Sequence, residues 1–198
     1  MHRRRAGHRG GVRAALSFRF AKAPIRAEPV ESPCDGLPAA LHGFTIAQIS
    51  DLHFGPTVKT PYVRAVVERV NALQADAVTD YGARHFDASH STDPSAALAG
   101  APRDVAGLVL RVLLAHQPRS APAAADAGFH VQLSGHTHGG QFWPWNLLVK
   151  LQQPFVAGLH RLRSMWVYTS RGTRYWGPPL RLGAPSEITR LRFVAALG

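Results

Sequence analysis

The sequence predicts a domain of the α/β class, and two neighbouring observations carry this prediction. Phe44–Ile49 is a short apolar run bounded by turn residues, which is typical of a buried strand. Thr60–Leu73 follows with apolar residues at helical spacing, and Ala75–Val78 is a second short run. A strand, a helix and a strand with short connections predict a βαβ unit. At 198 residues the chain has the length of one domain.

The first half of the chain supplies the start signals for these elements. Ala23–Val30 is a candidate edge strand, and Pro33–Gly43 is rich in turn residues. Thr60 is suited to cap a helix and Pro61 to occupy its first turn. The apolar stripe predicted to face a sheet consists of Val63, Val66, Val67, Val70 and Leu73.

In the second half, short strands and one helix follow a long irregular segment. Residues 79–107 show no sustained period and predict a loop with at most one short helix, which is long for a compact domain. Ala121–Ala127 predicts a short helix, and Gln141–Leu159 predicts an aromatic loop. The predicted strands are Leu108–Leu114, Phe129–Leu133, Met165–Ser170 and Glu187–Val194.

The positive charge is concentrated at the N-terminus. The formal net charge is +11, and residues 1–26 contain eight Lys or Arg and no Asp or Glu, which leaves 15 bases and 12 acids elsewhere. Residues 1–36 are therefore predicted to be a basic, poorly ordered arm ahead of a domain at 37–198. Three uses of the arm stay open: a solvated tail, non-specific contact with an anionic membrane surface or nucleic acid, or a targeting segment.

Two further features bear on the compartment. No run of apolar residues reaches the length of a membrane-spanning helix, so the chain is expected to be cytoplasmic or peripheral to a membrane. The single cysteine, Cys34, excludes an intramolecular disulfide framework and a cysteine-rich zinc site. Trp143 and Trp145 would cover the core, wall a cleft or meet a lipid interface.

Metal-competent side chains follow three of the predicted strands. They are Asp51 and His53, then His116, then His136 and His138. In an open α/β sheet, ligands bind beyond the carboxyl ends of the strands, so these side chains are expected to converge. Carboxylate and imidazole groups together suit Mn, Fe or Zn. The glycines around His136 and His138 would let the backbone approach a metal or a phosphate closely.

These motifs resemble those of the calcineurin-like metallophosphoesterases, and most closely a bacterial subgroup that acts as phosphodiesterases near the membrane. The resemblance extends from about Leu37 to Phe193. The segments that carry it are Ile49–His53, Leu114–Pro118, Ser134–Gln141, Ser170–Thr173, Tyr175–Pro179 and Ala184–Ile188.

The resemblance implies a four-layered α/β/β/α sandwich around a site for two divalent metals. Asp51, His53 and His138 would hold the first metal, and His116 and His136 the second. The metals would clamp a phosphate ester and generate the attacking hydroxide. Arg171 would face the anionic substrate, although a solvated arginine fits the sequence equally well.

The chain departs from the family pattern at two motifs. It contains neither the Gly-Asp pair whose carboxylate bridges the metals nor the Gly-Asn-His motif that supplies a metal ligand and the general acid. The simplest account is an internal truncation near 78/79, so no catalytic acid is assigned. Four residues that follow the join would be possible surrogates: Asp80, His85, Asp87 and His90.

The predicted function is therefore metal-dependent hydrolysis of a phosphodiester or phosphomonoester, impaired in this chain. One metal is expected to bind well and the second poorly, because the second would have two imidazoles and no carboxylate. Two alternatives stay open: an inactive metallophosphoesterase fragment, and a basic module for membrane or nucleic acid. No specific nucleic-acid partner is expected.

Overall fold

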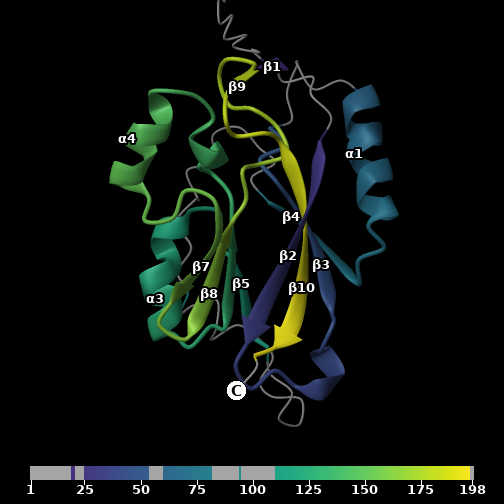
Figure 1. Ribbon diagram of the computed structural model, residues 1–198, viewed down its shortest axis with the longest axis vertical. Helices are drawn as coiled ribbons and strands as arrows, with labels where there is room; N and C mark the ends of the chain where they lie inside the picture. Colours follow the sequence, from purple (N-terminus) through teal and green to yellow (C-terminus); the bar gives the residue numbers. More distant parts are fainter. Residues whose placement is uncertain (1–18, 21–24, 54–59, 82–93, 95–109, 197–198) are drawn as a thin grey trace, which may run out of the picture.

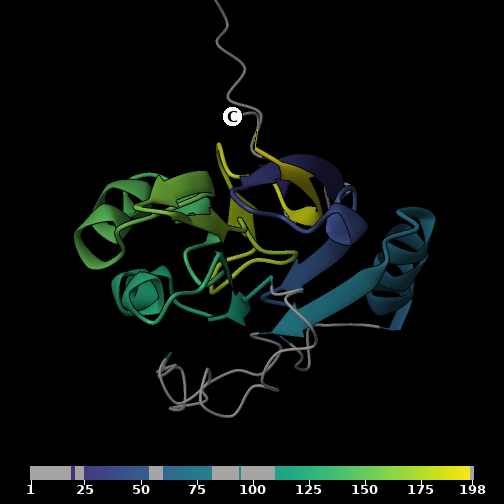
Figure 2. The ribbon, with the colours of Figure 1, turned by 90° about the horizontal axis from the view of Figure 1, so that it is seen from below.

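A computed structural model of the chain describes residues 19–20, 25–53, 60–81, 94 and 110–196. These residues form two four-stranded sheets that face each other, with helices on both outer sides (Figure 1). Figure 2 shows the same layers from below: α1 (Thr60–Ala72) covers one sheet, and α3 (Ala121–Asp126) and α4 (Trp145–Gln152) flank the other. The predicted α/β/β/α layering is confirmed.

The first sheet contains the predicted βαβ unit. Its strand order is β2–β10–β3–β4. The strands are β2 (Arg26–Cys34), β3 (Thr45–Ser50), β4 (Ala77–Tyr81) and β10 (Glu187–Ala195). β3 and β4 are parallel, as the sequence pattern predicts, whereas β10 is antiparallel to β3 and parallel to β2.

The second sheet has the order β5–β6–β8–β7. Its strands are β5 (Val112–Leu114), β6 (Val131–Ser134), β7 (Gly158–Leu162) and β8 (Met165–Thr169). β5, β6 and β8 are parallel, so the residues that follow β5 and β6 leave the sheet at the same edge. A two-residue pairing joins β1 (Arg19–Phe20) to β9 (Leu180–Arg181).

Three apolar clusters hold the layers together. Ile46 of β3 packs between the sheets with Leu133 and Phe193, whereas its neighbour Ala47 packs beneath α1 with Val66. Successive side chains of a strand point to opposite faces, so β3 contributes to two layers of core and all six of its residues are buried. The third cluster joins the second sheet to α3.

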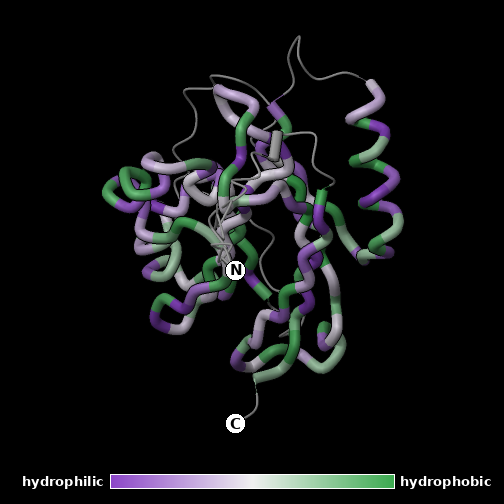
Figure 3. The backbone as a smooth tube through the Cα atoms, turned by 45° about the horizontal axis from the view of Figure 1, so that its top comes forward, coloured by the Kyte–Doolittle hydropathy of each residue, from purple (hydrophilic) through white to green (hydrophobic). Residues whose placement is uncertain are grey.

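The stripe predicted on α1 is narrower in the structure than in the sequence. Val66 and Val70, one turn apart, are the buried residues of this helix, whereas Val67 is 50% exposed. Hydrophobic and hydrophilic segments alternate along α1 in Figure 3. One sheet covers one side of the helix only, so the residue next to the buried pair faces outward.

The structure corrects the predicted limits of two strands, β2 and β4. The edge strand β2 runs from Arg26 to Cys34 instead of Ala23 to Val30, so part of the range 1–36 assigned to the arm belongs to the first sheet. Pro29 and Pro33 fit because β2 is an edge strand that pairs with β10 alone. β4 begins and ends later than predicted and runs without interruption across 78/79.

The predicted aromatic loop at Gln141–Leu159 is wrong, because it contains α4 and the start of β7. α4 buries Val149 and leaves Leu147, Leu148 and Leu151 exposed. Because apolar residues lie on both the buried and the exposed sides of α4, its sequence shows no single apolar stripe of the kind by which an amphipathic helix is identified.

Candidate metal centre

The five predicted ligands lie where three neighbouring strands end. Asp51 and His53 directly follow β3, and His116 comes two residues after β5. His136 and His138 follow β6, and His138 begins a single turn of 3-10 helix, η3 (His138–Gly140). All five are described by the structure, and the edges of the two sheets bring them together.

Asp51, His53 and His138 form the three-ligand group. One potential ligand atom from each lies within 4.8 Å of the others. Nε2 of His53 and Nε2 of His138 are 3.0 Å apart, and they lie 3.9 and 3.6 Å from Oδ1 of Asp51. The two rings are stacked, with centroids 5.1 Å apart. A carboxylate and two imidazoles from two different sheets thus face one point.

His116 and His136 form the histidine pair on the other side of Asp51. Nδ1 of His136 lies 3.3 Å from Nε2 of His116, and the rings meet edge to face. Nε2 of His116 is 3.7 Å from Oδ1 of Asp51. The backbone N–H of His136 donates to Oδ2 of Asp51 at 3.1 Å. Asp51 is therefore the carboxylate that both halves of the centre share.

The donor set fits a divalent metal. The Asp51 side chain is 1% exposed, and its Oδ1 lies within 3.9 Å of Nε2 of three histidines. A buried carboxylate ringed by histidine nitrogens offers oxygen and nitrogen lone pairs of the kind that Mn, Fe and Zn bind.

The backbone of the centre is held in an unfavourable conformation. The φ angles of Asp51, His53, His136 and His138 are 58°, 49°, 67° and 51°. A residue with a Cβ in this left-handed region costs about 1–3 kcal/mol and persists only where the surrounding structure enforces it. Four such residues among five predicted ligands indicate that the fold maintains this arrangement for a functional reason.

Two glycines make room for the Asp51 carboxylate. A Cβ on Gly135 would lie 2.4 Å from Oδ2 of Asp51. A Cβ on Gly172, whose φ is +79°, would lie 3.1 Å from Nδ1 of His138 and 3.2 Å from Cβ of Asp51. Gly135 and Gly172 therefore allow the backbone to lie close to the predicted ligands Asp51 and His138, and the predicted approach of the glycine-rich loop to a metal or a phosphate stays a prediction.

Burial determines the protonation of the centre. It raises the pKa of the Asp51 carboxyl, an effect that the charge of His53 opposes. It lowers the pKa of His138 well below its usual range, and the guanidinium of Arg181 acts in the same direction. His138 is therefore a neutral imidazole at pH 7, which is the form that binds metals.

Sequence reasoning missed Arg181, which is buried against His138. Its Nη2 lies 3.0 Å from Nδ1 of His138, and its Nη1 donates to the carbonyl oxygen of Arg171 at 2.7 Å. The carbonyl oxygen of Arg174, which also accepts from Arg181, lies 2.9 Å from the same Nδ1. A proton on Nδ1 that is donated to Arg174 leaves the Nε2 lone pair directed at Asp51.

No sequence signal could have found this contact, because 43 residues separate Arg181 from His138. Burial lowers the pKa of Arg181 to about 10, so its guanidinium stays charged at pH 7.

Arg171, predicted to face the substrate, forms an ion pair with Glu187. Nη1 of Arg171 lies 2.7 Å from Oε2 of Glu187, and the side chains are 31% and 2% exposed. Glu187 also accepts from the hydroxyl of Tyr168. Arg171 is thus anchored at one side and partly open at the other, and its contact with a substrate stays a prediction.

Of the four possible surrogates, the structure describes Asp80. It lies in β4 opposite Ile49, outside the three-ligand group. Burial and the charge of Asp51 raise its pKa, which indicates that the two carboxylates feel each other. His85, Asp87 and His90 lie outside the described residues.

Comparison with known proteins places this geometry in context. The chain is 52% identical over 81 residues to an uncharacterized metallophosphoesterase of Campylobacter jejuni, covering 40% of this chain and 22% of the relative. It is 28% identical over 262 aligned residues to a transmembrane protein with metallophosphoesterase domain of Danio rerio, covering 91% and 60%. It is 38% identical over 94 residues to phosphodiesterase YaeI of Escherichia coli, covering 42% and 32%.

These matches confirm the resemblance drawn from the motifs: the chain is a homologue of metallophosphoesterases, which are hydrolases that use divalent metals. It spans between 22% and 60% of the length of these three relatives. No family model and no solved structure matches the chain. Among the helices that the structure describes, none combines the length and apolarity needed to cross a membrane.

Proposed function

We propose that this chain is a metal-dependent phosphoesterase. The observation that carries the proposal is the three-ligand group, in which Asp51, His53 and His138 converge within 4.8 Å from two strand ends. The names of the relatives support a phosphate ester as the substrate, and the name of the Escherichia coli relative supports a diester.

Each residue of the centre has a proposed role. Asp51, His53 and His138 hold the first divalent metal, and His116 and His136 contribute to a second site. A metal bound there would supply an activated hydroxide and charge stabilisation for attack on phosphorus. The Arg174 carbonyl accepts the Nδ1 proton of His138 in a hydrogen bond, and Arg181 holds that carbonyl in place by donating to it. Arg171 directs the exposed part of its guanidinium at the substrate anion.

We further propose that the first metal binds more tightly than the second. The histidine pair has no carboxylate of its own and shares Asp51, whose single charge must offset two dications about 3.5–4 Å apart. Mn, Fe and Zn are the candidate metals, because they accept mixed imidazole and carboxylate ligands.

The missing motifs predict reduced turnover. The alignment with the Danio rerio relative extends over 262 residues whereas the chain has 198, which supports a block in that relative without a counterpart here. Its position near 78/79 is our proposal. Loss of a general acid typically costs about 10²–10⁴ in rate, and a poorly filled second site adds to this loss.

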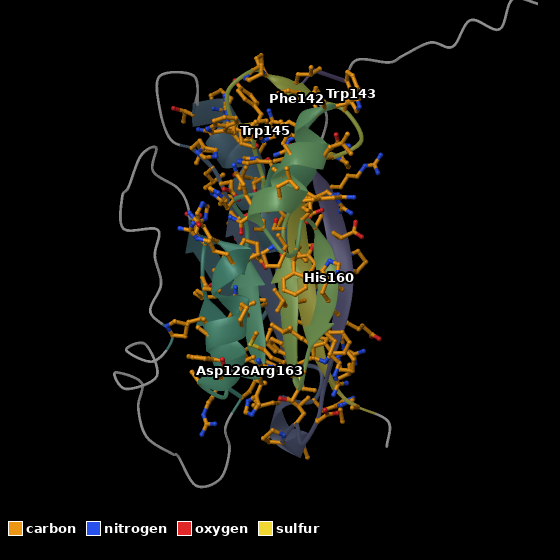
Figure 4. All side chains as sticks on the ribbon, turned by 90° about the vertical axis from the view of Figure 1, so that its left-hand side faces the viewer. Asp126, Phe142, Trp143, Trp145, His160 and Arg163 are labelled. Atoms are coloured by element: carbon orange, nitrogen blue, oxygen red, sulfur yellow. The ribbon has the colours of Figure 1, made fainter. Side chains whose placement is uncertain are left out.

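Hydrolysis of bis-p-nitrophenyl phosphate with added Mn²⁺ tests the proposal. Turnover is expected for the purified chain, and His138→Ala should abolish it. His160→Ala is the matched control, because this histidine lies on β7 and bonds the Ala157 carbonyl (Figure 4). Absence of turnover in folded, metal-loaded protein would favour the inactive-fragment alternative, and equal turnover in His138→Ala would contradict the proposed site.

A further inference from the structure

Glu187, the first residue of β10, is a buried carboxylate that the proposed chemistry does not use. Its side chain is 2% exposed, and its Oε2 lies 2.7 Å from Nη1 of Arg171 in an ion pair. Its Oε1 accepts a hydrogen bond from the backbone N–H of Arg171 at 3.0 Å and another from the hydroxyl of Tyr168 at 2.8 Å. These contacts hold the carboxylate in one place beside the guanidinium.

The main chain of Glu187 lies next to the segment that touches the first-metal ligands. Its N–H donates to the carbonyl oxygen of Gly172 at 3.1 Å, and its carbonyl oxygen accepts from Oγ1 of Thr173 at 3.1 Å. A Cβ on Gly172 would lie 3.1 Å from Nδ1 of His138, so the chain at this point lies against the centre. One strand residue therefore bonds both Arg171 and the wall of the centre.

The charge of Glu187 acts beyond its ion pair. After burial, it is the main cause that raises the pKa of Tyr168. It also acts on Arg181, whose Nη2 lies 3.0 Å from Nδ1 of His138. Burial lowers the pKa of Arg181 to about 10, and the charge of Glu187 is one of those that oppose this shift. The electrostatic influence of Glu187 therefore reaches the guanidinium behind the first metal site.

Arg171 lies on the turn that begins at His138. A Cβ on Gly139 would lie 3.0 Å from Cγ of Arg171, and the Arg171 side chain is 31% exposed. A guanidinium has five N–H donors, and the ion pair with Glu187 uses Nη1. Arg171 can therefore donate hydrogen bonds to an anion, while Glu187 offsets its positive charge.

Charge distinguishes the two kinds of phosphate ester that the proposed function leaves open. A phosphomonoester has a second pKa of about 6 and is a dianion at pH 8, whereas a phosphodiester is a monoanion. The energy between two charges is proportional to their product, so a nearby carboxylate repels the dianion about twice as strongly. We propose that Glu187 is a specificity residue, which weakens the binding of dianionic monoesters relative to monoanionic diesters.

This inference rests on the proposed function, but its test needs no turnover. The probes are methyl phosphate and dimethyl phosphate, which differ by one methyl group and one charge. Their dissociation constants are measured at pH 8 by titration into the Zn²⁺-loaded full chain, followed by phosphorus NMR. The readout is the dissociation constant of dimethyl phosphate divided by that of methyl phosphate, a ratio that rises when the dianion is favoured.

Glu187→Gln should raise this ratio about threefold or more, since removal of one negative charge benefits the dianion most. A purely structural role of Glu187 would not produce this rise, because a displaced Arg171 weakens the dianion at least as much as the monoanion. Glu31→Gln is the matched control, because Glu31 forms an exposed ion pair with Arg192, which lies opposite the start of β3 instead of its end.

The double change of Glu187→Gln with Arg171→Met separates charge from stability. Replacing both members of a buried pair is often neutral for stability, whereas removing one member leaves the other uncompensated. The double variant should return the ratio to the wild-type value or below, because the positive charge is removed as well. Circular dichroism checks that each variant keeps its fold.

Three results would overturn the inference: a ratio that Glu187→Gln leaves unchanged or lowers, an equal rise in Glu31→Gln, or wild-type protein that binds neither anion. A chain that shows the expected change in the ratio without any turnover of bis-p-nitrophenyl phosphate would contradict the proposed function alone.

Discussion

The two halves of the candidate metal centre differ in the source of their negative charge. The three-ligand group includes Asp51, so it combines one carboxylate with two imidazoles. The histidine pair contains two imidazoles and reaches the same carboxylate through Nε2 of His116, 3.7 Å from Oδ1. A metal in the first half would be held by a charge of its own, whereas a metal in the second would compete for that charge.

The halves also differ in the hydrogen bonds that hold their histidines in place. On its far side, His138 contacts the Arg174 carbonyl, which also accepts a hydrogen bond from Arg181. On the other side of the centre, the N–H of His136 bonds the shared carboxylate itself. Two imidazoles in each half therefore do not make the halves equivalent, since outer contacts and the shared Asp51 carboxylate would determine which half binds a metal first.

Removing the shared carboxylate should have the largest effect. Asp51→Asn keeps the size of the side chain and removes the charge that both halves use. We expect metal affinity to fall by at least about 10²-fold at both sites, since changes outside the ligand shell already cost 10–100-fold. Calorimetric titration with Mn²⁺ measures this, and retention of one tight site would show that Asp51 is not the common ligand.

Substitution of one histidine from each half should distinguish the two halves by the metal site that is lost. His138→Ala should abolish the tighter site, whereas His116→Ala should remove only the weaker one and leave the first dissociation constant within about threefold, a change of less than 1 kcal/mol. The metal content after dialysis, determined by mass spectrometry, provides a second readout. Equal losses in the two variants would contradict the unequal halves.

The brace behind His138 predicts a smaller change. Arg181→Met should weaken Mn²⁺ binding about 10–100-fold, which is typical for partners of a ligating histidine. Arg181→Lys should recover only part of this affinity, because an ammonium cannot reach the several carbonyls that the guanidinium fork bonds. Full affinity in a folded Met variant would assign Arg181 a role in stability alone.

Asp80 should have the smallest effect on metal binding. Its pKa is raised, so the folded state disfavours its charged form. Asp80→Asn should therefore unfold at higher urea than the wild type at pH 7. This difference should shrink as pH falls through the raised pKa of Asp80, and it should be gone below the ordinary carboxyl value of about 4. Metal affinity should stay unchanged, and a marked loss would identify Asp80 as a surrogate ligand.

The α/β class, the βαβ unit and the positions of the five metal-competent residues were predictable because local patterns encode them. A short apolar run ending in Ser50 and Asp51 indicates a strand and its exit, and parallel strands release their carboxyl ends at one edge. The same local signals failed for α4, whose leucines face outward, and for the limits of β2, where prolines lie within an edge strand.

The sequence by itself determined which side chains would end the strands and that one carboxylate would have to serve several histidines. The tertiary structure decided the rest: that Oδ1 of Asp51 lies within 3.9 Å of three imidazoles, that Arg181 supports His138, and that the leucines of α4 lie exposed. The physical reason is the separation along the chain over which each kind of interaction acts. Strand and turn preferences act between near neighbours in the chain, whereas these contacts join residues that only the packing of two sheets brings together.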